Sequence, residues 1–539
     1  MDPLARTVTR SGVTVLLVVG LLSLGLWATA WSQTPKTLVI AIDADPAGMD
    51  PQQGQSADTD YVISTIFDGI VNSQPGSSLV GPGLAEKWTI SPDGKTYTFS
   101  LRHGITFHDG TPMNARTVAE DLDRAINPNN PCYVLGRKGV STYDDFTFGS
   151  AKAGNVVALS VVDDYTLQFT LPGPNAPFLT NLAMVQTGIM SPAATKQYNC
   201  DAGEHPSGTG PFKFVEHVAN DHVTLDANSG YWRGRPKVDR IIFQIIPEST
   251  TRLLELQQNQ VQILSDLPPS DYNRITSNRD LRLYKQPGLT ILAVVMSTDV
   301  APFNDKRVRQ ALNYAVDKDA INKGLYGGAT TASQGMPPVL WGYDKAVKPY
   351  PYDPEKAKGL LKEAGFPNGF STDMMGYDVP RAYNPVGGAK LGEAVQAYLT
   401  KAGISVKVTQ YEWGAYLNKL RFTAWQGLGI WGWIGDSGDP DNFLGAMFAW
   451  DATANKAVTN NVAHYNNPQV NTLIQQGRLS TDQGKRAQVY TQANRLIHDD
   501  APWLFINHMD QARAARASVK GLLLNPVQMY FYMDRVSIQ

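Results

Sequence analysis

Residues 84–118 read LAEKWTISPDGKTYTFSLRHGITFHDGTPMNARTV, and this stretch says most about the fold. Apolar and polar residues alternate on both sides of SPDG (91–94), which is typical of two antiparallel strands joined by a tight turn. Asn114 then precedes apolar residues spaced by four, the pattern of a capped amphipathic helix. A hairpin followed by a helix predicts a small α+β domain.

The segments on either side add further strands. Residues 156–171 (VVALSVVDDYTLQFTL) alternate again and predict a second hairpin. Residues 37–42 (TLVIAI) are apolar and β-branched, which predicts a buried strand near the N-terminus. Residues 238–247 (VDRIIFQIIP) are almost continuously apolar, which predicts a central strand.

The C-terminal half alternates strands with helices. One predicted helix has Asp353 at its N-cap, Pro354 at its first position and Gly365 at its C-terminal end. A strand predicted over residues 426–433 (QGLGIWGW) runs directly into the sequence IGDSGDPDNF. Asp436 therefore follows a strand in an α/β domain, which is where ligands bind in open α/β sheets.

Size and composition describe a globular chain of about two to four domains. The chain has 539 residues, of which 42% are hydrophobic and 18% are charged, and its formal net charge is −2. Basic residues form no long block, so no nucleic-acid partner is expected.

The N-terminus has the features of an export signal. Arg6 and Arg10 precede an uncharged apolar run over residues 13–27, and small residues follow at 28–30. We predict a signal peptide over residues 1–30 that is cleaved, leaving a periplasmic protein. An uncleaved membrane anchor is the alternative, although the run is near the short end for a span. No cysteine lies near the cleavage point, so a lipoprotein is not expected.

The chain contains two cysteines, Cys132 and Cys200. In an oxidising compartment they can pair, and closing so long a loop would stabilise the fold by about 4 kcal/mol. Two buried free thiols are the alternative. Two cysteines this far apart do not make a zinc site without further ligands.

Residues 435–438 (GDSG) resemble the turn that carries the nucleophile of trypsin-like serine proteases. A nucleophilic Ser437 would need a neighbouring histidine, and the protease pattern has a second glycine where this chain has Asp439. No histidine stands in a recognisable catalytic context. We therefore expect no catalytic residue, and a secreted serine hydrolase using Ser437 is the alternative from another class.

Metal chemistry finds little support in the sequence. His103 and His108 lie at a hairpin edge and are interpreted as surface or hydrogen-bonded residues. Asp436, Asp439 and Asp441 crowd together but lack the spacing and distal glutamate of an EF-hand. We expect no metal and no other cofactor. A carboxylate beside tryptophans can instead bind an ammonium group.

Four motifs in order resemble the family-5 extracellular solute-binding proteins, which are the peptide- and nickel-type receptors of ABC importers. The resemblance covers essentially the whole mature chain. It implies an α/β fold of the bilobed periplasmic-binding-protein type II (cluster C) with an extra α+β domain, and no enzyme activity. The motifs are residues 84–118, SGTGPFKF (207–214), YWRGRPKVDRIIF (231–243) and FNDKRVRQALNYAVDK (303–318).

The resemblance also implies a division into domains, with hinge strands near residues 289–295 and 503–508. The expected parts are lobe I over residues 34–75, 205–290 and 510–539, an additional α+β domain over 76–204 inserted in lobe I, and lobe II over 291–509.

The dipeptide-binding branch of the family is the most similar, through VPRAYNP (379–385) and through YEWGAYLNKL (411–420) leading to WIGDSGDPDNF (433–443). This match implies that Arg381 pairs with the carboxylate of a peptide and Asp436 with its α-ammonium. Ala382 and Ser437 depart from the commoner proline and asparagine, which leaves side-chain preference open.

Four further contacts follow from the same resemblance. Tyr383 and Trp433 would line the pocket, and Gly48 and Met49 of an early loop would contact the ligand from the other lobe. The expected protein is a monomeric periplasmic receptor that delivers dipeptides to an inner-membrane ABC permease. Alternative ligands within the family are longer peptides, nickel or its chelates, haem, glutathione-like molecules and opines. An exported chaperone is a further class, and it would not need the pair of opposite charges.

Overall fold

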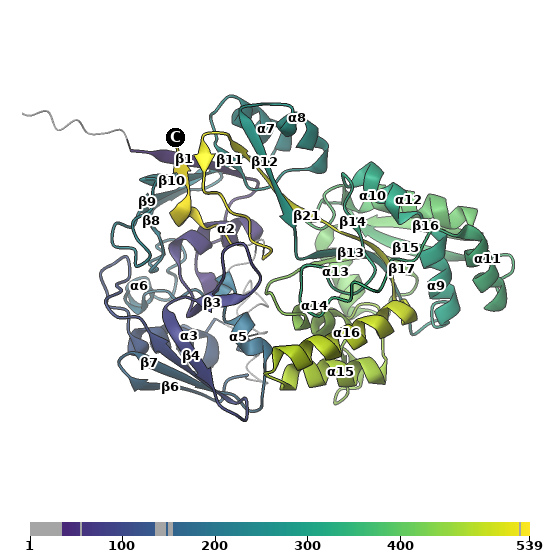
Figure 1. Cartoon of the computed structure of the whole chain (residues 1–539), viewed down its shortest axis with the longest axis horizontal. Helices are drawn as coiled ribbons and strands as arrows, with labels where there is room; N and C mark the ends of the chain where they lie inside the picture. The colour runs from purple at the N-terminus through teal and green to yellow at the C-terminus, as the bar shows by residue number, and fades with distance from the viewer. Residues whose placement is uncertain (1–34, 54–55, 135–146, 149–154, 528–529) are drawn as a thin grey trace, which may run out of the picture. The chain divides into compact units, whose positions relative to one another are not determined.

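Figure 1 presents the computed structural model of the chain. The chain divides into two units, Met1–Lys36 and Thr37–Gln539, and every described helix and strand belongs to the second. The predicted signal peptide lies outside the described residues. No helix within the described parts of the chain has the length and apolar character needed to cross a membrane. The structure describes residues 35–53, 56–134, 147–148, 155–527 and 530–539.

A seven-stranded mixed sheet contains the first strand of the chain, in the order β12-β21-β11-β1-β10-β9-β8 (Figure 1). β1 is central and pairs in parallel with β10 and β11, as the apolar sequences predict. The strands are β1 (Thr37–Ile42), β8 (Phe212–Val218), β9 (His222–Ala227), β10 (Arg240–Ile245), β11 (Ile263–Leu264), β12 (Leu281–Pro287) and β21 (Asp510–Arg516).

Helices pack on this sheet through two clusters of buried apolar residues. Tyr61 and Val62 of α2 belong to the main core, and Ser56 caps the start of this helix by accepting a hydrogen bond from Thr59 N–H (3.2 Å). Leu253 and Leu256 of α7 belong to a separate, smaller core. The helices are α2 (Ala57–Ile66), α7 (Ser249–Gln257) and α8 (Tyr272–Thr276).

A four-stranded antiparallel sheet, β4-β5-β7-β6, contains both predicted hairpins and has its own apolar core. Asn114 caps α3 in a capping box with Thr117, as the sequence predicts. A disulfide joins Cys132 to Cys200, with their Cα atoms 5.2 Å apart. The elements are β4 (Ala85–Ile90), β5 (Thr96–Leu101), β6 (Ala158–Asp163), β7 (Thr166–Thr170), α3 (Ala115–Ile126), α5 (Pro177–Asn181) and α6 (Pro192–Gln197).

A six-stranded sheet in the order β14-β20-β13-β17-β15-β16 forms the C-terminal half. Every residue of β13 and β20 is buried, because both strands lie inside the sheet with helices packed on it. The strands are β13 (Thr290–Met296), β14 (Thr330–Thr331), β15 (Phe370–Tyr377), β16 (Ile404–Tyr411), β17 (Leu428–Ile434) and β20 (Trp503–His508).

The helices of this half begin where the sequence places their caps. Asp353 accepts a hydrogen bond from Lys356 N–H (2.9 Å) at the start of α11, and Gly365 follows the helix with φ +92°. The helices are α9 (Lys306–Ala315), α10 (Lys318–Leu325), α11 (Pro354–Glu363), α12 (Gly387–Lys401), α13 (Trp413–Phe422), α14 (Asp441–Phe448), α15 (Pro468–Leu479) and α16 (Gln483–Asp500).

The three larger sheets draw their strands from within the ranges expected for the two lobes and the extra domain, except that β13 begins at Thr290, one residue inside the range expected for lobe I. The exact domain boundaries stay a prediction. Short paired strands complete the described structure: β2 (Val71–Ser73), β3 (Val80–Pro82), β18 (Trp450–Asp451), β19 (Lys456–Ala457), β22 (Val519–Lys520) and β23 (Ser537–Ile538).

The chain passes twice between the seven-stranded and six-stranded sheets, from β12 to β13 and from β20 to β21. Side chains tie the two passages together. The Thr290 hydroxyl donates to Met509 O (3.1 Å) and accepts from Met509 N–H (2.8 Å), and His508 Nδ1 donates to Thr290 O (2.8 Å). The hinges predicted near residues 289–295 and 503–508 adjoin these passages.

His508 should make the stability of the protein depend on pH. Burial lowers the pKa of His508 to about 4, from an ordinary value of 6.5. As pH falls from 6.5 to 4, the unfolded state binds a proton that the folded state does not, which costs on the order of 3 kcal/mol of stability. The stability advantage of wild type over His508→Gln should therefore shrink between pH 7 and pH 4 in urea unfolding.

His222→Gln is the matched control, because the contribution of His222 to stability should depend on pH with the opposite sign. The hydrogen bond to Asp221 raises the pKa of His222, so its contribution is present below pH 6.5 and is lost as pH rises. The advantage of wild type over His222→Gln should grow in acid. A pH-independent difference for His508→Gln would contradict the assignment.

Candidate functional site

Asp436 lies in the loop that joins the end of β17 to α14. It is 2% exposed, and the neighbouring side chain of Asn442 orients it. Asn442 Oδ1 accepts from Asp436 N–H (3.0 Å), and Asn442 Nδ2 donates to Asp436 Oδ2 (3.3 Å). The indole Nε1 of Trp433 donates to the same Asn442 Oδ1 (3.1 Å). One amide therefore aligns the carboxylate and the aromatic ring predicted to contact a ligand.

Ser437 is not arranged as a nucleophile. Its side chain is 3% exposed, and its hydroxyl has no hydrogen-bond partner among the described residues, whereas an activated serine needs a base beside it. Gly438 lies so close to the backbone of Ser78 that a Cβ atom would collide with it. Ser437 and Gly438 are therefore small residues required by close packing.

The other two carboxylates of the loop have arginine partners. Asp439, which stands where the protease pattern has glycine, accepts two hydrogen bonds from the guanidinium of Arg486 at 2.7 Å each. Both side chains are buried, at 1% and 6% exposed. Asp441 accepts from Arg478 Nε (2.8 Å). These pairs attach the loop to α15 and α16.

Arg381 lies in the loop that follows β15. Its guanidinium carbon is 3.7 Å from the centroid of the Trp413 ring, and its Nε has no hydrogen-bond partner among the described residues. Burial lowers the pKa of Arg381 from its ordinary value, which reflects a charge that is incompletely compensated. A partly buried guanidinium stacked on an indole retains the capacity to bind a carboxylate.

A tight turn positions this arginine. Arg381 and Asn384 exchange two backbone hydrogen bonds, at 3.1 and 2.7 Å. The buried side chain of Asn384 accepts from Tyr326 OH (2.8 Å) and donates to Tyr377 OH (2.9 Å). The turn is therefore anchored to β15 and to the end of α10.

The parallel pairing of β15 with β17 brings the two loops to one edge of the sheet. Met374 pairs with Leu428 and Met375 with Gly429, so both strands run toward the same edge, where the loops that carry Arg381 and Asp436 begin. Tyr383 packs directly on Gly432 of β17, where a Cβ atom would collide with the ring. Arg381, Tyr383 and Asp436 thus follow the carboxyl ends of neighbouring parallel strands, and Trp433 lies near the end of β17.

Gly48 and Met49 lie in the loop between β1 and α2, on the other large sheet. Gly48 has φ +136°, a conformation that favours glycine. Met49 is fully buried in the main core, and its N–H donates to Gly203 O (3.0 Å). Their predicted contact with a ligand stays a prediction.

Asp60 is a residue that the sequence reasoning missed. It lies on α2, is 2% exposed, and accepts a hydrogen bond from Gln186 Nε2 (3.0 Å). Burial, followed by the charge of Asp436, raises the pKa of Asp60 well above its ordinary value. Asp60 lies on a helix that packs on the seven-stranded sheet, and Asp436 follows a strand of the six-stranded sheet. The carboxyl groups of these two residues therefore interact electrostatically. The acidic start of α2 (ADTDY, 57–61) was the available signal, but nothing in it indicated the partner.

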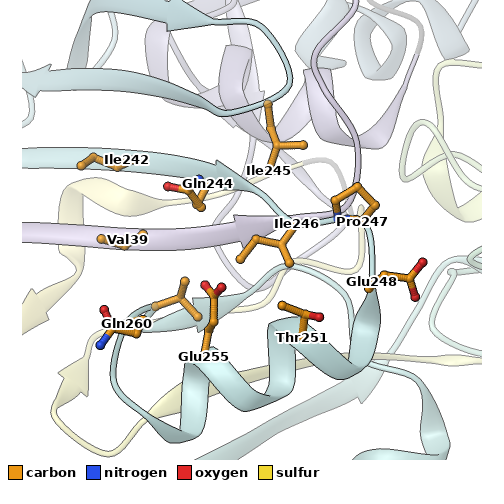
Figure 2. Close-up of a pocket in the computed structure, with 11 residues that line it drawn as sticks. Val39, Ile242, Gln244, Ile245, Ile246, Pro247, Glu248, Thr251, Glu255 and Gln260 are labelled. Carbon is orange, nitrogen blue, oxygen red and sulfur yellow. The ribbon is translucent and has the colours of Figure 1, made fainter.

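A separate groove of 540 Å³ lies between β10 and α7, and Figure 2 shows the side chains around it. Its presence explains why alternate residues of β10 are only partly buried. None of the six predicted ligand contacts lines it, so we do not assign the predicted site to this groove. Its lining residues are Val39, Ile242, Gln244, Ile245, Ile246, Pro247, Glu248, Thr251, Glu255, Gln260 and Val261.

Two large sheets joined by two passages, with opposite charges at strand ends, are features of a ligand-binding receptor. The sequence profile of the bacterial extracellular solute-binding proteins, family 5, matches residues 80–455, and the chain belongs to this family. The predicted fold class, an α/β binding-protein fold with several domains, is confirmed by this match and by the solved structures that share the fold.

Three known proteins illustrate the similarity. The chain is 37% identical over 538 residues to the dipeptide-binding protein of Escherichia coli K12, covering 96% of this chain and 98% of that protein. It is 35% identical over 517 residues to heme-binding protein A of Haemophilus influenzae, covering 92% and 91%. The ABC transporter-associated periplasmic binding protein DppA of Helicobacter pylori, solved with the peptide STSA, has a TM-score of 0.77 and 31% identity over 93% of this chain and 98% of that one.

Gly432→Ala should displace Tyr383 from β17, because the added methyl group would occupy the space of the ring. Overpacking of this kind lowers the free energy of unfolding by about 1–3 kcal/mol. Gly359→Ala is the matched control, since a Cβ at this position in α11 meets no atom within 4 Å. Urea unfolding of both variants checks this, and equal stability would contradict the packing.

Asp439→Asn should destabilise the protein strongly, because it leaves the buried guanidinium of Arg486 without its charged partner. Breaking a buried pair in this way costs about 3–5 kcal/mol. Glu355→Gln, which removes an ion pair whose side chains are 81% and 50% exposed, should cost less than about 1 kcal/mol. Denaturant unfolding measures the stability of both variants. Similar losses of stability would contradict a stabilising role for the buried pair of Asp439 and Arg486.

Proposed function

We propose that this protein is a periplasmic receptor that binds dipeptides, and short peptides more generally, and delivers them to an ABC transporter in the inner membrane. Its family and the named ligands of two of its relatives support a peptide ligand. The observation that carries the proposal is the position of Arg381 and Asp436 after neighbouring parallel strands, β15 and β17.

The two charges suit the two ends of a zwitterionic peptide. Neighbouring strands lie about 4.8 Å apart, and the termini of an extended dipeptide are separated by about 7 Å. Asp436 would bind the α-ammonium. Arg381 would bind the carboxylate. Each charge-assisted hydrogen bond contributes about 1.5–3 kcal/mol.

Peptide length follows from the same geometry. A third residue would move one terminal charge past its partner, and a buried unpaired charge costs several kcal/mol. The Helicobacter pylori relative was solved with STSA, which has four residues, so length selectivity has to be measured for this chain.

No chemical step is part of the proposed function. Ser437 lies buried with no base beside it among the described residues, and the loop carboxylates at Asp439 and Asp441 are paired with arginines. The receptor would act as a monomer after removal of residues 1–30, without a lipid anchor, and its partner would be the permease.

Haem is the rival ligand, because one relative at 35% identity is named for it. Haem carries carboxylates but no α-ammonium group. It could therefore use Arg381 but would present no ammonium group to Asp436, and this difference separates the two ligands experimentally.

Calorimetry with alanyl-leucine and its blocked forms tests the assignment. Asp436→Asn should weaken binding of the free dipeptide by about tenfold or more but should not further weaken the N-acetylated form, which has already lost the charge that Asp436 binds. Arg381→Gln should weaken binding of the free dipeptide by about tenfold or more but should not further weaken binding of the C-amidated form, which has already lost the charge that Arg381 binds.

Asp451→Asn, at a surface turn outside the site, is the charge-matched control and should bind as wild type. If both site variants bind the free dipeptide as wild type does, the site assignment fails. If wild type binds haem but no peptide of two to four residues, the peptide proposal fails.

A further inference from the structure

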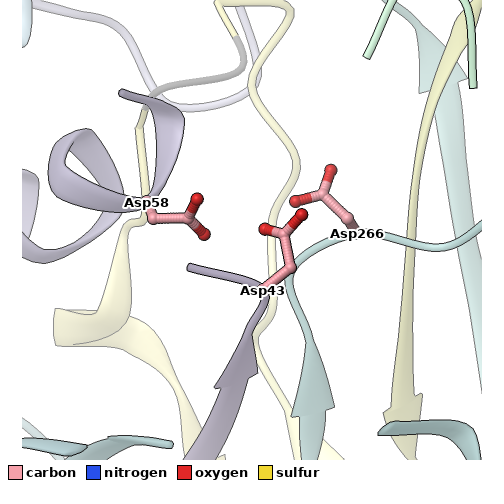
Figure 3. A group of neighbouring side chains, drawn as sticks. All are labelled: Asp43, Asp58 and Asp266. Atoms are coloured by element: carbon pink, nitrogen blue, oxygen red, sulfur yellow. The ribbon is translucent and has the colours of Figure 1, made fainter. Parts of the chain in front are cut away.

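Three carboxylates meet beside the seven-stranded sheet, away from the strands that carry Arg381 and Asp436 (Figure 3). Asp43 follows β1 and Asp266 follows β11, which are neighbouring parallel strands. Ala41 pairs with Leu264, so Asp43 and Asp266, two residues further on in each strand, are level with each other. Asp58, on the first turn of α2, completes the group.

The oxygens of this carboxylate cluster (Asp43, Asp58 and Asp266) are close enough to share one ion. One oxygen from each residue lies within 4.8 Å of the other two. Oxygens that share one Ca²⁺, at 2.3–2.6 Å each, are at most about 4.6–5.2 Å apart. The spacing therefore fits one shared ion. Ca²⁺ accepts several protein oxygens at once in a flexible geometry, whereas Mg²⁺ keeps several waters, so a site of three carboxylates suits Ca²⁺ better.

Asp58 supplies a second and separate observation. It is 7% exposed, and its Oδ1 is buried without a hydrogen-bond partner among the described residues, while Asp43 hydrogen-bonds to the same carboxyl group. Figure 3 shows this carboxylate directed toward Asp43 and Asp266. A buried carboxylate oxygen without a donor is costly, and a cation between the three groups would remove that cost.

The electrostatic state of the cluster agrees with this geometry. Burial, followed by the charges of Asp43 and Asp266, raises the pKa of Asp58 to about 9. Burial and Asp43 raise the pKa of Asp266 to about 6, although Arg513 and Arg252 oppose that shift. The two arginines therefore compensate the cluster only in part.

We propose that Asp43, Asp58 and Asp266 form a binding site for a hard divalent cation of the Ca²⁺ type. Carboxylate oxygens are the ligands that such ions prefer, and Asp43 is exposed, which gives the ion a route from solvent and leaves room for water ligands. The ion would link β1, β11 and the start of α2. This site does not depend on the proposed peptide ligand.

The ion would have a structural consequence near the peptide site. Asp60, whose field reaches Asp436, lies two residues after Asp58 on the same helix. An ion bound to Asp58 would hold the first turn of α2 against the ends of β1 and β11. We expect it to stabilise this helix start.

Calorimetry and thermal unfolding of the purified protein, after treatment with EDTA, test the proposal. CaCl₂ should bind with a stoichiometry of one and raise the unfolding midpoint, since a ligand that binds only the folded state stabilises it. MgCl₂ should bind more weakly. Asp58→Asn should weaken Ca²⁺ binding by about tenfold or more, as should Asp266→Asn.

Asp373→Asn, which removes an exposed carboxylate on β15, is the matched control and should bind Ca²⁺ as wild type does. Asp58→Asn should fold, because asparagine has nearly the shape of aspartate and adds no charge to the crowded cluster, and its midpoint without metal should equal or exceed that of wild type.

Three results would overturn the proposal. The first is no saturable Ca²⁺ binding by wild type. The second is equal Ca²⁺ binding by Asp58→Asn and Asp373→Asn, which would mean weak adsorption to surface charges. The third is loss of dipeptide binding in Asp58→Asn with no metal binding by wild type, which would assign the cluster to the peptide ammonium.

Discussion

The parallel pairing of β15 with β17 is the constraint on which the predicted site depends. Parallel neighbours bring their carboxyl ends to one edge of a sheet, so the loops after Tyr377 and Ile434 meet there. Gly432 allows the loop after β15 to pack closely on β17, because only a residue without a side chain leaves room for the ring of Tyr383 on the strand. The backbone hydrogen bonds of these strands therefore bring the loops that carry Arg381 and Asp436 to one edge of the sheet.

The charges in this region have two different tasks, and their partners distinguish them. Asp439 is buried and fully paired with Arg486, so it anchors a loop. Asp436 is equally buried, Asn442 Nδ2 donates to its Oδ2, and its charge helps to raise the pKa of Asp60. We propose that this carboxylate, held in place by an amide, serves a ligand.

Local sequence patterns predicted the elements well and the distant contacts poorly. Alternation over residues 84–101 and caps at Asn114 and Asp353 correspond to the observed hairpin and helices, because these signals depend on neighbours in the chain. Asn442, Asp60 and the cluster around Asp58 were not found. Each acts through a partner brought near only by folding, and the burial that raises the pKa of Asp58 has no local signature.

The sequence by itself determined the class of protein, the order of strands and helices, and the residue types at the two strand ends. It did so because hydrophobic periodicity, turn residues and ordered family motifs are properties of the chain. Only the tertiary structure decided which arginines pair with Asp439 and Asp441. Asp436, Asp439 and Asp441 stand within six residues of one another, and nothing local tells them apart. Arg486 and Arg478, some forty residues away in the chain, make the distinction through helices that pack on the loop.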